Sequence, residues 1–168
     1  MGLPSSHGLY KVSDGTTVKV TLLDTAGQEK YRSINEGYYK NADCCLLVYD
    51  ISNRNSFEEC KKYYNPNIKE KCKEGIKVIL LGNKTDLEDQ RQVPSEEGAS
   101  FALENNYHFM EISCLQNKNV AGAFESLIEM TNIELKKSNS SNLRLSISKH
   151  EEKKDKNNKE NNKNNCNC

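Results

Sequence analysis

Apolar residues follow two different spacings along the first 137 residues of the chain. Short runs in which nearly every residue or every second residue is apolar are typical of β-strands, and apolar residues three or four positions apart are typical of helices. Strand-type runs occur at residues 9–12, 17–23, 44–49, 76–81 and 107–112. Asp14-Gly15 predicts a turn that pairs the first two runs antiparallel. The runs at 44–49 and 76–81 are almost entirely apolar, which predicts strands covered on both faces.

Helical spacing occurs between the later strands and after the last one. Asn55 or Ser56 can cap a helix, which Pro66 must break or kink because proline lacks a backbone N–H. A second helix opens at residues 95–97 and stops near 105. A third carries its apolar residues on one stripe between residues 120 and 128. Strands that alternate with helices predict an α/β fold with a mostly parallel sheet.

The distribution of apolar residues also predicts the domain organisation. Hydrophobic residues make up 35% of the 168 residues, and Asn, Lys, Ser and Glu dominate from residue 138 onward. Such a composition cannot bury enough apolar surface to fold. Residues 1–8 hold no periodic pattern. We therefore predict a disordered N-terminus over residues 1–8, one folded domain over residues 9–137 and a disordered tail over residues 138–168.

Charge and cysteine content narrow the classes of function. Lys and Arg total 24, as do Asp and Glu, so the net charge of +0 offers no electrostatic footprint for nucleic acid. No run of apolar residues is long enough to span a bilayer, and no signal peptide precedes the body, which favours a cytoplasmic protein. The seven cysteines show no C-x-x-C pairing and the three histidines are scattered, so we expect neither a zinc site nor disulfides.

Polar loops follow three of the predicted strands, at the sheet edge where α/β folds bind their ligands. The first loop is Asp24-Thr25-Ala26-Gly27-Gln28-Glu29. Asp24 can hold Mg²⁺ directly or through water, Gly27 lets the backbone approach a phosphate closely, and the Gln28 amide can orient an attacking water. A polar turn without a ligand is the alternative for this hexapeptide taken alone.

The second and third loops predict recognition of a purine base. If the ligand is a guanine nucleotide, the Asp86 carboxylate accepts from both guanine N1–H and the 2-amino group, whereas adenine would leave the charge unpaired, a discrimination of roughly 10⁴. Asn83 can bond the base edge and tie loops together, and the Lys84 stem can cover the ring face. The backbone N–H groups of Ser113 and Cys114 can donate to guanine O6. A capped turn remains the alternative for the tetrapeptide at 83–86 alone.

These loops resemble, in order and spacing, three nucleotide-binding motifs of the Ras-superfamily small GTPases: Asp24-Thr25-Ala26-Gly27-Gln28-Glu29, Asn83-Lys84-Thr85-Asp86 and Glu111-Ile112-Ser113-Cys114. Residues 30–34, 38–42 and 47–52 are similar to diagnostic segments of the Rab branch. The chain ends Cys166-Asn167-Cys168, similar to the Rab ending that receives two geranylgeranyl groups.

The resemblance implies a fold, an activity and roles for individual residues. The fold is a three-layer, doubly wound, mostly parallel sheet, the small G-protein fold, and the activity is GTP binding and hydrolysis as a switch in vesicle trafficking. Asp24 would serve Mg²⁺, Ala26 would belong to the nucleotide-binding residues, the Gly27 N–H would sense the γ-phosphate, and Gln28 would position the hydrolytic water. The residues implied to hold guanine are Asn83, Lys84 and Asp86, with the Ser113-Cys114 backbone behind it.

The resemblance also implies partners and a location. Expected partners are GTP and GDP, Rab escort and dissociation-inhibitor proteins, exchange factors, GTPase-activating proteins and effectors. Prenyl groups on Cys166 and Cys168 would anchor the protein to the cytosolic face of an intracellular membrane, with residues 138–165 as the tether.

Three features depart from the Rab pattern. Leu23 replaces a tryptophan that effectors contact, and Leu115 replaces a lysine beside the base. No Gly-Lys dipeptide occurs, so the phosphate loop G-x-x-x-x-G-K-[ST] is absent, and with it the first strand and first helix of the family's fold. This predicts weak nucleotide binding and leaves two hypotheses: a Rab-type GTPase incomplete at its N-terminus, or a catalytically dead, lipid-anchored protein that occupies Rab partners.

Overall fold

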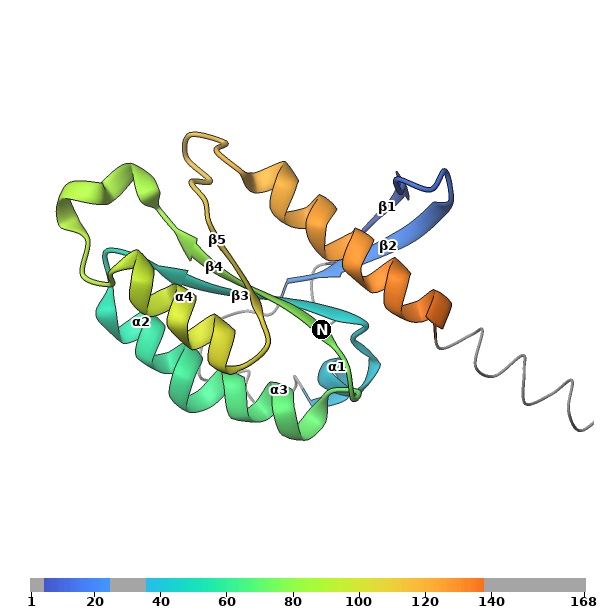
Figure 1. The fold of residues 1–168 in the computed structure, drawn as a ribbon, viewed down its shortest axis with the longest axis horizontal. Coiled ribbons are helices and arrows are strands. Elements are labelled where there is room, and N and C mark those ends of the chain that lie inside the picture. Colours follow the sequence, from blue (N-terminus) through green and yellow to red (C-terminus); the bar gives the residue numbers. More distant parts are fainter. Residues whose placement is uncertain (1–4, 25–35, 138–168) are drawn as a thin grey trace, which may run out of the picture. The chain divides into compact units, whose positions relative to one another are not determined.

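Three parallel strands form the central sheet of the computed structural model, which describes residues 5–24 and 36–137. They are β3 (Cys44–Asp50), β4 (Lys77–Asn83) and β5 (His108–Glu111), with β4 in the middle (Figure 1). The chain divides into two compact units, residues 1–131 and residues 132–168, and the arrangement described below is that of the first.

Helices cover both faces of this sheet (Figure 1). On one face lie α2 (Arg54–Glu59), α3 (Asn65–Lys71) and α4 (Ser95–Glu104). The other face is covered by residues 120–131, the part within the first unit of a helix that begins at residue 120 and runs to residue 137. This arrangement of helices on both sides of a parallel sheet confirms the predicted three-layer α/β fold.

Two hydrophobic cores follow from the alternation of side chains along the strands. One core packs the sheet against α2, α3 and α4 and consists of Leu47, Tyr49, Ile51, Phe57, Cys60, Ile68, Val78, Leu80, Val93 and Ala102. The other packs the opposite face against the last helix and consists of Ile79, Leu81, Ile112, Ala123 and Leu127. Both faces of β4 are therefore buried, as its apolar sequence predicts. On β3, Val48 remains 48% exposed, so the prediction that this strand is covered on both faces is wrong at Val48.

The helical stretch after β3 differs from its prediction in two respects. Asn53, rather than Asn55 or Ser56, caps α2, because its side chain accepts from the backbone N–H groups of both those residues. The chain then continues through a π-helical turn, Cys60–Tyr64, into α3, where Pro66 occupies the first turn. The wider turn and the N-terminal position accommodate a proline that has no N–H to donate, so the helix is modified there without being broken.

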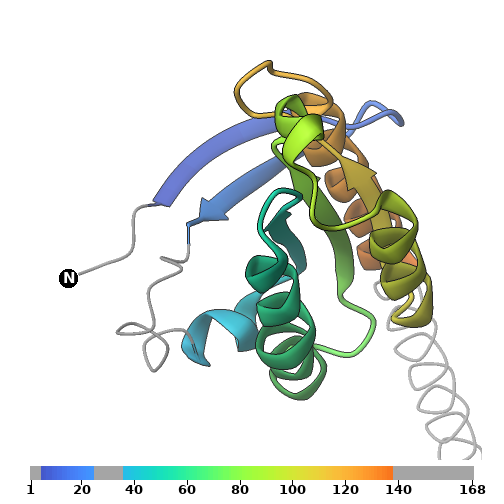
Figure 2. The same ribbon diagram turned by 90° about the vertical axis from the view of Figure 1, so that its left-hand side faces the viewer.

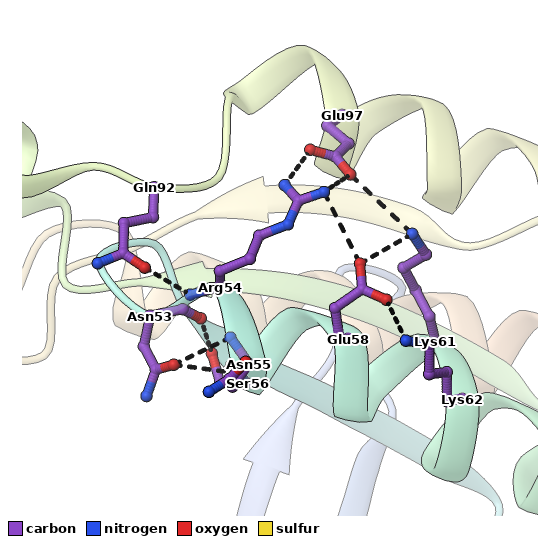
Figure 3. A network of polar contacts seen from close by, with 9 residues as sticks. All are labelled: Asn53, Arg54, Asn55, Ser56, Glu58, Lys61, Lys62, Gln92 and Glu97. Carbon is purple, nitrogen blue, oxygen red and sulfur yellow. Dashed lines mark hydrogen bonds and ion pairs between the residues drawn. The ribbon is translucent and has the colours of Figure 1, made fainter.

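Polar contacts join α2 to the segment that leads into α4 (Figure 3). Both Nη atoms of Arg54 donate to the Glu97 carboxylate, and the Arg54 backbone N–H donates to Gln92 Oε1 at 3.1 Å. The backbone N–H groups of Gln92 and Val93 in turn donate to the Ile51 carbonyl oxygen, at 2.8 and 3.1 Å. These contacts hold the segment that follows β3 beside the start of α4.

The first two strands form a hairpin with its own two-stranded sheet (Figure 2). β1 (Ser5–Lys11) pairs antiparallel with β2 (Thr17–Leu23) across a turn in which Gly15 has a φ of 85°, as predicted for Asp14-Gly15. β1 begins at Ser5, which corrects the prediction of disorder for residues 5–8. Those residues lack an apolar pattern, but each pairs with a residue at 20–23 of β2. No strand pairing joins the hairpin to β3 within the described residues.

One further short helix lies in the described part of the chain. α1 (Glu36–Asn41) precedes β3, within the aromatic and basic stretch of the sequence. A 3₁₀ segment, Thr85–Gln90, follows β4. β5 is two residues shorter than the run predicted at residues 107–112, because Tyr107 precedes the strand and Ile112 already belongs to the connection that leaves the sheet.

Candidate functional site

The carboxyl ends of the three parallel strands bring the predicted base-binding residues to one edge of the sheet. Asp50, the last residue of β3, lies opposite Asn83, the last residue of β4, and Gly82 lies opposite Glu111 at the end of β5. The segments that leave β4 and β5 are therefore neighbours. This is the edge at which open α/β sheets bind ligands.

Asn83 connects these two segments through its side chain. Its Oδ1 accepts from the Lys84 backbone N–H at 2.7 Å and from the Cys114 backbone N–H at 3.2 Å. The Thr85 N–H adds a bond to the Ile112 carbonyl oxygen at 3.2 Å. The loop-tying role predicted for Asn83 is thus present, and any contact with a base edge would use its Nδ2 group.

The carboxylate of Asp86 is oriented by a buried hydroxyl. Ser113 is fully buried, and its Oγ donates to Asp86 Oδ1 while it accepts from the Gln116 backbone N–H at 3.1 Å. This charge-assisted hydrogen bond restrains the orientation of the carboxylate. Asp86 Oδ2 has no hydrogen-bond partner within residues 5–24 and 36–137, and it can therefore accept from a ligand N–H.

A closed loop follows β5 and presents Cys114 and Leu115. Ser113 and Lys118 exchange backbone hydrogen bonds of 3.1 and 2.9 Å, which close the loop as an isolated antiparallel bridge. Asn119 has a left-handed backbone, φ 60°, and its Nδ2 donates to the Glu111 carbonyl oxygen at 3.0 Å. The exposed Leu115 lies in this loop.

The backbone donors predicted for guanine O6 are engaged within the protein. The Ser113 N–H donates to the Lys118 carbonyl oxygen, so Ser113 acts here through its hydroxyl on Asp86 and not through its backbone. The Cys114 N–H donates to Asn83 Oδ1, and it can reach a base oxygen only by sharing that bond or exchanging it. The structure therefore differs from the prediction in the donors at this side of the site.

Lys84 takes an unusual backbone conformation and makes an ion pair. Its φ of 69° and ψ of 41° lie in the left-handed region, which costs a residue other than glycine about 1–2 kcal/mol. Its Nζ lies 2.7 Å from Asp50 Oδ2. The hydrogen bond from this ammonium group to Asp50 raises the pKa of Lys84. No role for Asp50 is predicted from its sequence pattern, because its position opposite Asn83 follows from the strand register of the folded sheet.

The first predicted loop lies mostly outside the described residues. Asp24, directly after β2, is exposed, and Ala26, Gly27 and Gln28 are not among the described residues. Within residues 5–24 and 36–137 no three His, Cys, Asp or Glu side chains form a metal site. A single carboxylate fits Mg²⁺, which keeps several waters and takes its other ligands from phosphate oxygens. The role of Asp24 therefore stays a prediction.

Comparison with known proteins assigns the chain to a protein family. A family model described as the Ras family matches residues 8–133, about three quarters of the chain. The chain belongs to the Ras family. The match covers the hairpin from residue 8 onward, the three-stranded sheet and the loops that carry Asp24, Asn83, Asp86 and Ser113.

Similar proteins within the family carry Rab names. Rab-11B of Dictyostelium discoideum is 38% identical over 146 residues, which is 87% of this chain and 66% of that protein. Rab11A of Lotus japonicus is 41% identical over 128 residues, with 76% and 56% covered. Rab-8A of Bos taurus is 42% identical over 114 residues, with 68% and 55% covered. These relatives confirm the resemblance to the Rab branch, and the chain spans between about half and two thirds of their length.

Proposed function

We propose that this chain is a Rab-type GTPase, which binds GTP and GDP with Mg²⁺ and acts as a switch in vesicle trafficking. The observation that supports it most strongly is the joined pair of loops at the ends of β4 and β5. Asn83 links the backbone of both loops and buried Ser113 orients the Asp86 carboxylate. A carboxylate held in this way is suited to pair with two N–H groups on the edge of guanine.

Competition between nucleotides tests this proposal. GDP should displace a fluorescent GDP analogue from the purified chain at far lower concentration than ADP, because adenine offers Asp86 no pair of N–H donors. Asp86→Asn should reduce this preference and favour xanthosine diphosphate, since the amide presents a donor where the carboxylate accepted. Equal competition by GDP and ADP would contradict guanine recognition, and an unchanged preference in the variant would contradict the role of Asp86.

Hydrolysis depends on residues of the first loop, for which the role assignments are proposals by family resemblance. Asp24 would hold Mg²⁺ with the phosphates, Ala26 and Gly27 would lie at the γ-phosphate, and Gln28 would orient the attacking water. Gln28→Leu should slow single-turnover GTP hydrolysis and leave GTP affinity nearly unchanged. A chain that binds guanine nucleotide but hydrolyses no GTP would favour the second hypothesis, a binding protein that occupies Rab partners.

Attachment to membranes is the remaining part of the proposal. Within the described residues no helix is long and apolar enough to cross a membrane. Cys166 and Cys168 would carry prenyl groups, and two lipid chains hold a protein on a membrane where one binds reversibly. Replacing both cysteines with serine should release the protein from the cytosolic face of its membrane, and replacing one should release part of it. Membrane fractionation in which the double variant still sediments with membranes would contradict this anchor.

A further inference from the structure

The two loops at the ends of β4 and β5, which carry Asn83, Asp86 and Ser113, are called the base loops. Asp50 is a charged residue at their edge, and the expected chemistry of GTP binding gives it no role. It ends β3, and the parallel register places it opposite Asn83, the residue before Lys84. Its Oδ2 lies 2.7 Å from Lys84 Nζ. The Asp50 carboxylate at the end of β3 therefore contacts the side chain of the residue that follows β4.

The Asp50 carboxylate is also held by hydrogen bonds from Ser52, two residues along the chain, independently of Lys84. Its Oδ1 accepts from the Ser52 backbone N–H at 2.8 Å and from Ser52 Oγ at 2.7 Å. The Asp50 backbone N–H donates to Ser56 Oγ at 3.0 Å, in the first turn of α2. The Asp50 side chain is 20% exposed and the Lys84 side chain 51% exposed, so the carboxylate is the anchored partner and the lysine is the one that gains order.

Lys84 needs such an anchor because its stem is long and its backbone is constrained. A lysine side chain loses up to about 2 kcal/mol of rotamer entropy when it is fixed in one conformation. The left-handed φ of 69° sets where the stem starts, and the ion pair sets where it ends. A stem fixed at both ends is ordered before a base arrives, and preorganisation of this kind raises affinity by lowering the ordering cost of binding.

We propose that Asp50 is a positioning residue for guanine-nucleotide binding, which fixes the Lys84 side chain beside the base loops. This inference rests on the proposed function, because it assigns Lys84 to the face of the base. Charged groups that face the Lys84 ammonium from the packed elements are Asp50 of β3 and Asp86 of the segment after β4. Asp50 makes the direct contact, which leaves the Asp86 carboxylate to Ser113 and the ligand.

The test measures GDP affinity of the full chain for a set of variants. Asp50→Asn should weaken GDP binding about two- to fivefold, the range of a partly exposed ion pair. Asp50→Glu, which keeps the charge, should restore part of the loss. Lys84→Met keeps an apolar stem without the ammonium, so Asp50→Asn should have no further effect in that background.

The chain supplies a matched control at the other end of the same strand. Asp43, directly before β3, pairs with Lys73 at 2.8 Å, and both side chains are about half exposed. Asp43→Asn removes an ion pair of the same type and similar length, 2.8 Å against 2.7 Å, away from the base loops, and GDP affinity should not change. A wild-type affinity in Asp50→Asn, or an equal loss in the Lys84→Met background, would overturn the inference while the proposed function stands.

A second measurement separates the inference from the proposed function. If the wild-type chain binds no GDP, the proposed function fails. The ion pair between Asp50 and Lys84 can then still be tested by NMR titration of Lys84 Nζ. The ammonium pKa, raised by the bond to Asp50, should fall toward its ordinary value in Asp50→Asn and stay raised in Asp43→Asn. An unchanged pKa of Lys84 in Asp50→Asn overturns the positioning role in either case.

Discussion

The two sheets of this molecule differ in how deeply their strands are buried, and each precedes residues of one half of the proposed nucleotide site. Strand β4 is buried from Val78 to Gly82 because helices cover both faces of its sheet. Strand β2 of the hairpin has no fully buried residue. The base loops therefore leave a packed core, whereas Asp24 follows an exposed strand. The contrast teaches that the loops proposed to bind the base are supported by a packed core, whereas Asp24, proposed to serve Mg²⁺, follows a strand with no buried residue.

The largest difference between the two sheets should appear when one leucine of each is truncated. Leu80→Ala in β4 removes a side chain with no exposed surface and should cost about 2–5 kcal/mol of unfolding free energy. Leu9→Ala in β1, where the leucine is 77% exposed, should stay within about 0.5 kcal/mol. Urea denaturation followed by circular dichroism measures both. Similar losses for the two variants would show that the hairpin is as well packed as the sheet.

A smaller effect should follow from removing the hydroxyl that orients Asp86. Ser113→Ala deletes a fully buried donor to the carboxylate and leaves the Gln116 N–H without its acceptor, at a cost of about 1–3 kcal/mol. Ser113→Ala should also weaken the binding of GDP more than the binding of ADP. Ser100→Ala, at an exposed position of α4, is the control and should change stability by less than about 0.5 kcal/mol. If both variants were equally stable, the base loops would not depend on the buried bond.

The smallest effect concerns the pH dependence contributed by Asp50. Burial alone would raise its pKa, but hydrogen bonds from Lys84 and Ser52 outweigh burial, so the folded-state pKa lies below the ordinary value. The unfolded state therefore takes up the proton first as pH falls. The stability due to Asp50 is present above the unfolded pKa of about 3.9 and is lost as pH falls through the folded pKa.

Comparison of wild type with Asp50→Asn isolates this contribution from the other carboxylates. The difference in unfolding free energy between the two proteins should be constant above about pH 5 and should shrink below about pH 4. Urea denaturation at a series of pH values provides the measurement. A difference that grows as pH falls would contradict the sign of the pKa shift.

The sequence was sufficient for the fold because its strands carry strong patterns. The nearly continuous apolar run around β4 predicted a strand buried on both faces, and Asp14-Gly15 predicted the hairpin turn. Local capping was harder, since Asn53, Asn55 and Ser56 are chemically similar and only the backbone conformation selects Asn53. The strand over residues 5–8 was missed because its support is pairing with β2, which no local pattern reports.

The composition of the base loops was predictable, but their internal bonds were not. The motifs identified Asn83, Asp86 and Ser113, but their spacing does not reveal which of their polar atoms are hydrogen-bonded within the protein. The backbone N–H of Ser113 is engaged because it donates to the Lys118 carbonyl oxygen. Lys118 is brought there by a loop in which its neighbours Asn117 and Asn119 both have left-handed backbone conformations. The Asp50 pair with Lys84 depends on strand register, which the apolar runs of β3 and β4 fix only once the sheet is formed.

Guanine recognition by the base loops is tested most directly by an NMR titration of the full chain with GMP and with AMP. The two ligands share their phosphate, so a difference between them reports on the base alone. GMP should shift the backbone amide signals of Lys84, Asp86 and Cys114, and AMP at the same concentration should leave them unchanged. The β1–β2 amides should respond to neither ligand. Equal shifts with both ligands, or GMP shifts confined to the hairpin, would contradict the claim that the loops after β4 and β5 recognise guanine.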